Sequence, residues 1–328
     1  MMNARAIPLS PFPGRDIDEW LTDYRAALEG RDESTIDAYL RVVRQFAVWF
    51  AERPGNGGQF YPQSITRTAI DLYLSTLKST SHKNLARSAL SGFCVWLIEE
   101  QGLLAKNPTR GINIPPQAAL APRVLREDQR QVLREVVERE CEDSGDLRGV
   151  AAFALGYWAG CRVSDVSWLL MDNLHVTAKA GWMIVGHKGG KQREIDLTNE
   201  ARRAVFDYLT QGERKDSAYV FTSQRAKKSL ARGESDGWRW SEDGIHVWWQ
   251  HIKERARRSE AELIGDITFH DLRHDFAHRA RAAGWSLEEV AYYLGHITKS
   301  GTPAIQTTVR YTQVSKEHVK QKLKDIKG

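Results

Sequence analysis

The five residues HDLRH at positions 270–274 decide how the rest of this sequence is interpreted. His270 and Arg273 are three positions apart, and His270 and His274 are four apart, so on an α-helix these side chains share one face. A guanidinium and an imidazole on one face suit a phosphate group, because Arg binds two phosphate oxygens while His gives or takes a proton. A solvent-exposed helix rich in His and Arg has the same spacing, so this motif alone does not identify a site.

Two further segments follow it in the chain. The residues SLEE from Ser286 form a capping box, which predicts a short helix that ends at Gly295 and holds His296 rigidly at its end. The segment TTVRYT at 307–312 then places Tyr311 before a basic stretch. A phenol has a pKa of roughly 10 and attacks only beside cationic groups. Tyr311 is therefore a candidate nucleophile only if the cations gather around it.

Two upstream segments supply such cations. AGCRVSD at 159–165 places Arg162 at a glycine-bearing turn between two predicted helices. HKGGK at 187–191 places Lys188 at the tip of a predicted hairpin, in reach of a nucleic-acid groove or a leaving group, with Lys191 as the alternative. Each segment is ordinary singly, and their order along the chain makes the pattern specific.

The composition indicates a globular protein of two domains. A chain of 328 residues exceeds the usual size of one domain, and 41% hydrophobic residues can fill two cores. The 47 Lys and Arg against 42 Asp and Glu give a net charge of +5, which is compatible with nucleic-acid binding without requiring it. The three cysteines are widely spaced and form no CxxC motif, which predicts free thiols in a reducing compartment. No apolar signal region and no run of about 18 apolar residues is present, which predicts a cytoplasmic protein without a membrane partner.

Helical spacing of apolar residues dominates the first part of the chain after a tail at 1–16. It predicts a four-helix unit over residues 17–107. Its expected helices lie at 17–28, 36–50, 70–77 and from Thr80 to Gly102, with caps at Ser34, Thr68 and Gly102. The prolines of residues 108–123 predict a linker.

The second domain, residues 124–328, is expected to be mainly α with a small antiparallel β-sheet. Alternating residues at 182–185 and 192–197 predict a hairpin, and 219–222 a third strand. The expected helices lie at 127–139, 147–158 and 244–258 and in the remaining chain. The fold class is therefore α+β with few strands.

Taken in this order, the segments resemble the catalytic signature of the tyrosine recombinase and phage integrase family. The resemblance covers nearly the whole chain, because the four-helix unit is similar to the SAM-like core-binding domain of the family and the chain from Val124 onward to its catalytic domain. The matching signature residues are Arg162, Lys188, His270, Arg273, His296 and Tyr311.

The resemblance implies a site-specific recombinase that cleaves and rejoins double-stranded DNA through a 3′-phosphotyrosyl link, without a metal or another cofactor. It implies that Tyr311 attacks the phosphate while His270 takes the Tyr proton. Arg162 and Arg273 hold the phosphate, and Lys188 protonates the leaving 5′-oxygen. The absence of HExxH, of clustered carboxylates and of Cys/His ligand spacing in the sequence agrees with the expectation of no metal.

The sequence departs from the family pattern in a few places. The resemblance implies that His296 donates a hydrogen bond to the phosphate. The stretch from His296 to Tyr311 is longer than is usual in the family, which predicts an insertion in ITKSGTPAIQ at 297–306. Asp165 stands where Glu is commoner. Other tyrosines without the family context are weaker rivals of Tyr311 for the role of nucleophile: Tyr219, Tyr292 and Tyr293.

The resemblance also implies partners. A homotetramer assembles on paired recombination sites, with possible accessory or directionality proteins, in processes such as the integration or excision of a mobile genetic element. Residues 316–328 have near-helical apolar spacing and either dock on a neighbouring subunit or pack on their own domain. Three alternatives remain at this stage: a type IB topoisomerase, a non-catalytic DNA-binding protein of the same fold, and a helical protein without a DNA partner.

Overall fold

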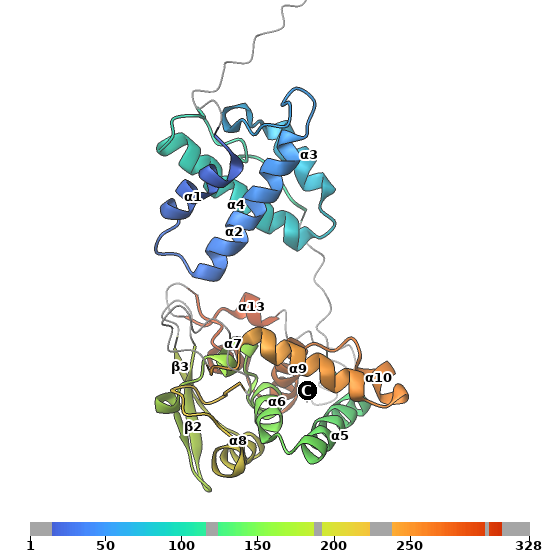
Figure 1. Ribbon diagram of the computed structural model, residues 1–328. Helices are drawn as coiled ribbons and strands as arrows, with labels where there is room; N and C mark the ends of the chain where they lie inside the picture. Colours follow the sequence, from blue (N-terminus) through green and yellow to red (C-terminus); the bar gives the residue numbers. More distant parts are fainter. Residues whose placement is uncertain (1–14, 116–123, 187–191, 224–237, 299–301, 310–328) are drawn as a thin grey trace, which may run out of the picture. The chain divides into compact units, whose positions relative to one another are not determined.

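The chain divides into two compact units, Met1–Ala118 and Ala119–Gly328, each described here by itself (Figure 1). The structure is a computed structural model. It describes residues 15–115, 124–186, 192–223, 238–298 and 302–309. Within these ranges, no helix is both long enough and apolar enough to cross a membrane.

In the described residues the first unit has four α-helices, as the apolar spacing predicted, and in addition one 3₁₀ turn. Its elements are α1 (Ile17–Ala27), α2 (Glu33–Ala51), η1 (Pro62–Ser64), α3 (Arg67–Thr76) and α4 (Thr80–Glu99). Each α-helix begins where a side-chain oxygen accepts a backbone N–H of the first turn, the capping residues being Asp16, Asp32, Thr66 and Ser79. The caps predicted at Ser34 and Thr68 are wrong by two residues, because Asp32 and Thr66 already serve these helix ends.

Aromatic side chains fill the core of the first unit. Trp20 and Trp96 meet edge to face with ring centroids 6.2 Å apart, and Phe46 meets Tyr73 in the same way at 5.2 Å. The chain leaves α4 and stays on this unit for a short distance, because Ile112 is buried in the same core. The linker boundaries at 108 and 123 remain a prediction.

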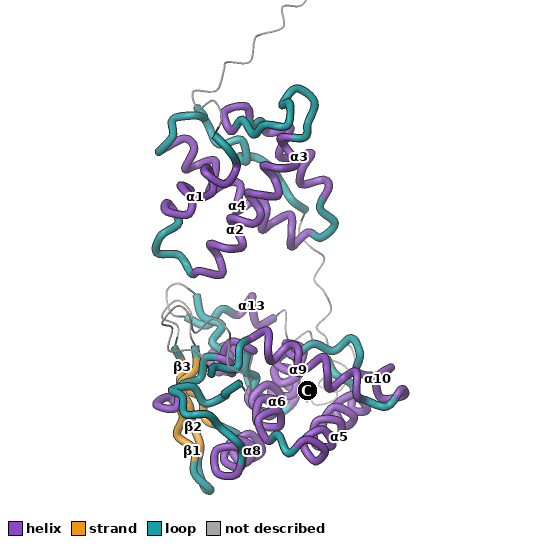
Figure 2. The backbone as a smooth tube through the Cα atoms, in the orientation of Figure 1, coloured by secondary structure: helices purple, strands orange, loops and turns teal. Residues whose placement is uncertain are grey.

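The second unit holds the remaining helices and all three strands of the described chain. Its elements are α5 (Glu127–Ser144), α6 (Leu147–Ala159), α7 (Val163–Ser167), η2 (Met171–Asn173), β1 (Leu174–Val176), β2 (Gly181–Val185), β3 (Arg193–Asp196), α8 (Asn199–Gln211), α9 (Glu242–Arg255), α10 (Arg258–Ile264), α11 (Phe269–Ala282), α12 (Leu287–Leu294) and α13 (Ile305–Val309). The expected α+β class with few strands is confirmed, and Figure 2 shows how small the sheet is beside the helices.

The sheet is antiparallel in the order β1-β2-β3. Met183 pairs with Leu174 on one side and with Ile195 on the other, so the predicted hairpin is confirmed. The third strand predicted at 219–222 is wrong. That segment makes only isolated bridges among the described residues, because its two ends pair with different segments, Tyr219 with Leu170 and Thr222 with Arg239.

Helix α6 lies in the core of the second unit, and its glycines allow other helices to approach it closely. A Cβ on Gly156 would lie 2.8 Å from a ring carbon of Phe269. Gly160 ends the helix at a φ of 62°, and a Cβ there would lie 2.7 Å from Leu294 and 2.8 Å from Phe276. Only glycine fits this turn without displacing its neighbours, and the turn places Arg162 beside the ends of α11 and α12.

Candidate active site

Arg162 is held at the N-terminal end of α7. The Asp165 carboxylate accepts a hydrogen bond from the Arg162 backbone N–H at 3.0 Å and lies 4.0 Å from its guanidinium. The Asp165 side chain is buried, whereas 36% of the Arg162 side chain is exposed. Because the carboxylate fixes the backbone and leaves the guanidinium partly free, Arg162 can still bind an anion.

Asp165 has a second cationic partner that the sequence analysis did not single out. Arg193, the first residue of β3, donates a hydrogen bond to its carboxylate at 3.1 Å. Burial alone would raise the pKa of Asp165, but Arg193, the Arg162 N–H and the Arg273 charge outweigh it and hold this pKa below its usual value. Asp165 is therefore ionised at neutral pH.

Helix α11 carries the HDLRH motif, and its start is fixed by Asp271. The Asp271 carboxylate accepts hydrogen bonds from the backbone N–H and the hydroxyl of Thr268, at 2.7 and 2.8 Å. His270 lies in the first turn, and its ring meets that of His274 edge to face with centroids 4.8 Å apart. The predicted helix is confirmed, and so is the shared face of the two imidazoles.

Arg273 points into the protein from the next turn and is completely buried. Its Nη1 donates to the carbonyl oxygen of Gly160 at 2.7 Å, and its Nη2 donates to the carbonyl oxygen of Leu294. The same Nη2 lies 3.0 Å from Nε2 of His296. One guanidinium thus connects the ends of α6 and α12, where Arg162 and His296 follow.

His296 is placed by the end of α12, where Gly295 has a φ of 67°. Because Arg273 can only donate, Nε2 of His296 is an acceptor and the proton lies on Nδ1. Nδ1 then donates to the Thr308 hydroxyl at 3.1 Å, and this hydroxyl can donate to the Ala304 carbonyl oxygen at 3.3 Å. The ring is buried, so His296 is a neutral link between α11 and α13.

The imidazoles of His270 and His296 are both neutral at pH 7. Burial and the Arg273 and Arg162 charges lower the pKa of His296 to about 3. Desolvation by the surrounding protein lowers the pKa of His270 to about 4, and His274, Arg273 and Arg162 add to this effect. Part of the His270 side chain is nevertheless accessible to solvent. A neutral imidazole can take a proton, and the cations disfavour a second positive charge at this position.

The two sides of the stretch predicted to hold an insertion, residues 297–306, pair with each other where the structure describes them. Ile297 pairs with Pro303 in an antiparallel bridge, and the Ala304 N–H donates to the carbonyl oxygen of His296 at 2.6 Å. The chain thus leaves His296, makes an excursion and returns beside it before α13 begins at Ile305. Helix α13 therefore lies close to His296, and the insertion remains a prediction.

The structure brings four of the predicted residues together: Arg162, His270, Arg273 and His296. Lys188, its alternative Lys191 and Tyr311 lie outside the described residues, as does the segment 316–328. The assignment of these residues to a catalytic site remains a prediction.

The three rival tyrosines lie in other settings. The Tyr293 hydroxyl donates to the Asp196 carbonyl oxygen at 2.9 Å, and burial raises the pKa of Tyr293 well above its usual value, so its proton is retained. Tyr219 packs edge to face on Trp168. Tyr292 is 71% exposed on α12.

The hydrogen bond between His296 and Thr308 has a measurable consequence. Thr308→Val removes the acceptor of a buried N–H while keeping the shape of the side chain, so it is expected to lower the free energy of unfolding by about 1–3 kcal/mol. Thr308→Ser is the control, because it keeps the hydroxyl. Urea unfolding checks this, and equal stability of the Val and Ser variants would contradict the link.

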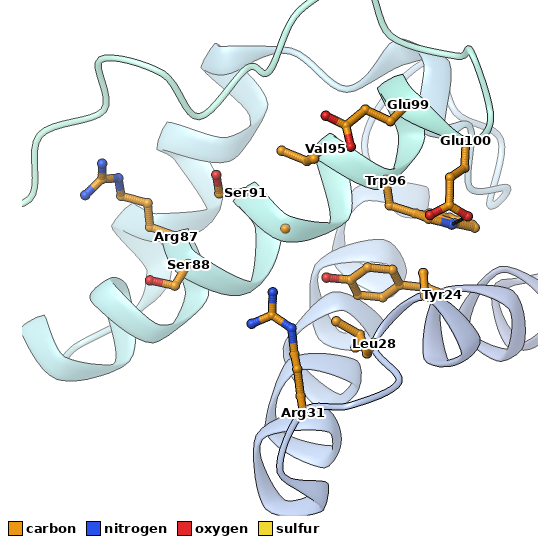
Figure 3. Close-up of a pocket in the computed structure, with 12 residues that line it drawn as sticks. Tyr24, Leu28, Arg31, Arg87, Ser88, Ser91, Val95, Trp96, Glu99 and Glu100 are labelled. Carbon is orange, nitrogen blue, oxygen red and sulfur yellow. Dashed lines mark hydrogen bonds between the residues drawn. The ribbon is translucent and has the colours of Figure 1, made fainter. Parts of the chain in front are cut away.

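A pocket of about 510 Å³ lies in the first unit, apart from the residues above. Figure 3 shows Arg31 reaching from the loop after α1 toward α4, which contributes Arg87, Ser88 and Ser91. Glu100 lines the far end, where its carboxylate accepts a hydrogen bond from the Trp96 indole at 3.0 Å. The end of the pocket with the two arginines and the hydroxyls suits an anion, whereas Glu99 and Glu100 make the other end acidic.

The comparisons with known proteins identify the family of this chain. The model of the phage integrase family matches residues 123–318. Since this match covers more than half of the chain, the chain belongs to the phage integrase family, the site-specific tyrosine recombinases, which are enzymes that cleave and rejoin DNA.

Individual relatives match over nearly the full length. Tyrosine recombinase XerC of Neisseria meningitidis serogroup C (strain 053442) is 28% identical over 302 residues, which cover 89% of this chain and 88% of the relative. Tyrosine recombinase XerD of Ralstonia nicotianae is 28% identical over 325 residues, which cover 96% and 94%.

Solved structures share the fold. The Tn1549 transposon integrase in complex with transposon right-end DNA has a TM-score of 0.67 at 14% identity, covering 95% of this chain and 99% of that one. The lambda integrase (residues 75–356) bound to DNA has a TM-score of 0.62 at 18% identity, covering 92% and 98%. At these identities the similarity concerns the fold alone.

Proposed function

We propose that this chain recombines DNA at specific sites, with Tyr311 as nucleophile and Arg162, Lys188, His270, Arg273 and His296 as the other residues of the active site. The observation that carries this assignment is the cluster around Arg273, where two guanidinium groups and two neutral imidazoles meet at the ends of three helices. Such a cluster suits a phosphodiester in which negative charge increases during the reaction.

In the proposed reaction the Tyr311 oxygen forms a bond to the scissile phosphorus while the bond from phosphorus to the 5′-oxygen breaks. His270 takes the phenolic proton, and Lys188 gives a proton to the departing 5′-oxygen. Arg162 and Arg273 stabilise the charge on the non-bridging oxygens. The phosphotyrosine keeps the energy of the broken ester, so attack by a 5′-hydroxyl restores a DNA strand without ATP.

Two features of the structure refine these roles. Arg273 is completely buried, so its contact with a phosphate requires the surrounding segments to rearrange when DNA binds. Nε2 of His296 accepts a hydrogen bond from Arg273, whereas donation to the phosphate was expected from the sequence. The geometry therefore favours a role for His296 in orienting Arg273.

The proposed substrate is double-stranded DNA, which implies a cytoplasmic location. We assign the first unit to DNA binding as well, because Arg31, Arg87 and the Ser88 and Ser91 hydroxyls offer phosphate ligands in one pocket. A homotetramer on paired sites, with accessory or directionality proteins, follows from the family resemblance and completes the proposal.

The test is the capture of a covalent complex. The protein is incubated with a library of nicked duplexes from its source genome, denatured, and the attached DNA is sequenced while the modified peptide is identified by mass spectrometry. We expect adducts at one recurrent site, linked to Tyr311, and none with Tyr311→Phe. Adducts that persist in this variant would move the nucleophile to another residue, and their absence from the wild type would contradict the proposed activity.

A further inference from the structure

Arg193 joins three segments of the second unit through one side chain. It begins β3, its Nε donates to the carbonyl oxygen of Tyr293 at 2.9 Å, and its Nη2 donates to the Asp165 carboxylate at 3.1 Å. Only 12% of the side chain is exposed. A surface ion pair would leave both partners hydrated, whereas this guanidinium is almost enclosed by groups that accept its hydrogen bonds.

Each of these three segments leads to a residue of the proposed active site. Asp165 fixes the backbone of Arg162. Tyr293 lies three residues before His296, on the last turn of α12. Arg193 itself follows the segment that contains Lys188 by a few residues. The hydrogen bonds of Arg193 therefore connect the beginning of β3 to the segments that carry Arg162 and His296.

The space for Arg193 is provided by a glycine. A Cβ on Gly295 would lie 2.8 Å from Cδ and 3.1 Å from Nη1 of Arg193. Gly295 also has a φ of 67°, a backbone conformation that favours glycine. Glycine is thus required both by the turn at the end of α12 and by the closeness of the Arg193 side chain. His296 is the next residue, so Arg193 packs against the backbone that leads directly into it.

Resting on the proposed function, we infer that Arg193 is a positioning residue of the recombination reaction, which aligns Arg162 and His296 without touching the DNA. It acts through the ionised Asp165 carboxylate and the Tyr293 carbonyl. The other charged or titratable groups around Asp165 are Arg162 at the start of α7, Arg273 from α11 and the Cys161 thiol, whose pKa is raised to about 12 by burial and which stays neutral.

The proposal predicts a change in the pH profile. The positive charge of Arg193 helps to keep Asp165 ionised. A protonated Asp165 is a weaker acceptor for the Arg162 N–H and no longer attracts the Arg162 guanidinium by its charge. Removing the Arg193 charge raises the pKa of Asp165. When the pH is lowered, the variant without this charge should therefore lose activity at a higher pH than the wild type does. A substitution that only loosened the fold would slow the reaction without moving this acidic limb.

The experiment uses the full-length protein and the DNA site found by adduct capture. Single-turnover rates of adduct formation and DNA affinity are measured from acidic to neutral pH for Arg193→Gln, Arg193→Lys and Arg214→Gln. Arg214 is the control, because it is another arginine that joins distant backbone groups through two hydrogen bonds, but its acceptors are the carbonyls of Val220 and Tyr219 and not the segments that carry Arg162 and His296.

We expect Arg193→Gln to slow adduct formation about 100-fold with unchanged DNA affinity and an acidic limb at higher pH. Arg193→Lys should restore the wild-type limb and part of the rate, because it keeps the charge but cannot reach both acceptors. A rate for Arg193→Gln no lower than that for Arg214→Gln, an unmoved limb, or a loss confined to DNA affinity would each overturn the positioning role. If the wild type and Arg214→Gln also form no adduct, the proposed function itself fails.

Discussion

Replacing Arg273 with Ala is expected to lower the rate of covalent adduct formation about 10³-fold. The substitution removes a guanidinium that is proposed to stabilise the phosphate in the transition state, where the loss of one donor costs about 10²–10³ in rate. It also leaves the Gly160 and Leu294 carbonyls and Nε2 of His296 without this donor in a buried place. Both effects act in the same direction.

The measurement is a single-turnover time course on the recombination site, analysed on denaturing gels and corrected for the folded fraction. Arg273→Lys keeps the charge but cannot span the same acceptors, and it should lie between Ala and wild type. Arg281→Ala is the matched control on the same helix, because Arg281 donates to the Trp285 carbonyl away from the cluster. A rate for Arg273→Ala within tenfold of this control would contradict the assignment.

Asp275→Ala should cause the largest loss of stability, about 3–5 kcal/mol in the free energy of unfolding. The Asp275 carboxylate is completely buried and pairs with Arg130 and Arg279, each at 2.9 Å, while it accepts the Leu125 N–H at 3.2 Å. The Ala variant leaves two partly buried guanidinium groups without their shared anion. It also breaks the contact that ties the beginning of α5 to α11.

Urea unfolding of the two variants checks this prediction. The control is Glu262→Ala, which removes another i,i+4 partner of an arginine, Arg258, but on a helix face where the two side chains are 71% and 96% exposed. Such a surface pair contributes about 0–1 kcal/mol. If Asp275→Ala lost no more than this control, the carboxylate would not be holding α5 and α11 together.

Much of the fold follows from local signals in the sequence. Helix α12 is an example, because Ser286 caps it and Gly295 ends it, and both signals lie next to the helix in the sequence. The third strand was misplaced for the opposite reason. Strand β1 has only three residues, too few for an alternating pattern, and His175 is fixed in it by stacking on Trp182 of β2 at a centroid distance of 3.8 Å.

The site was predictable as a set of residue types, but its connections were not. The HDLRH motif identified Arg273, yet its acceptors are the backbone carbonyls of Gly160 and Leu294, and a carbonyl has no sequence signature. Arg193 was not predicted to belong to the site, because its segment has only the alternating pattern of a β-strand. Its partners Asp165 and Tyr293 are distant in the chain, and only the fold brings them to it.

The loop between His296 and Ala304 has its ends joined by a hydrogen bond of 2.6 Å, so its two anchors are fixed independently of what lies between them. The entropy of closing a loop grows slowly with length, by roughly 0.6 kcal/mol for each doubling. We therefore expect the protein to accept a peptide tag or a reporter sequence between Thr298 and Thr302 while α13 keeps its place. This position is a natural attachment point for following the protein on DNA.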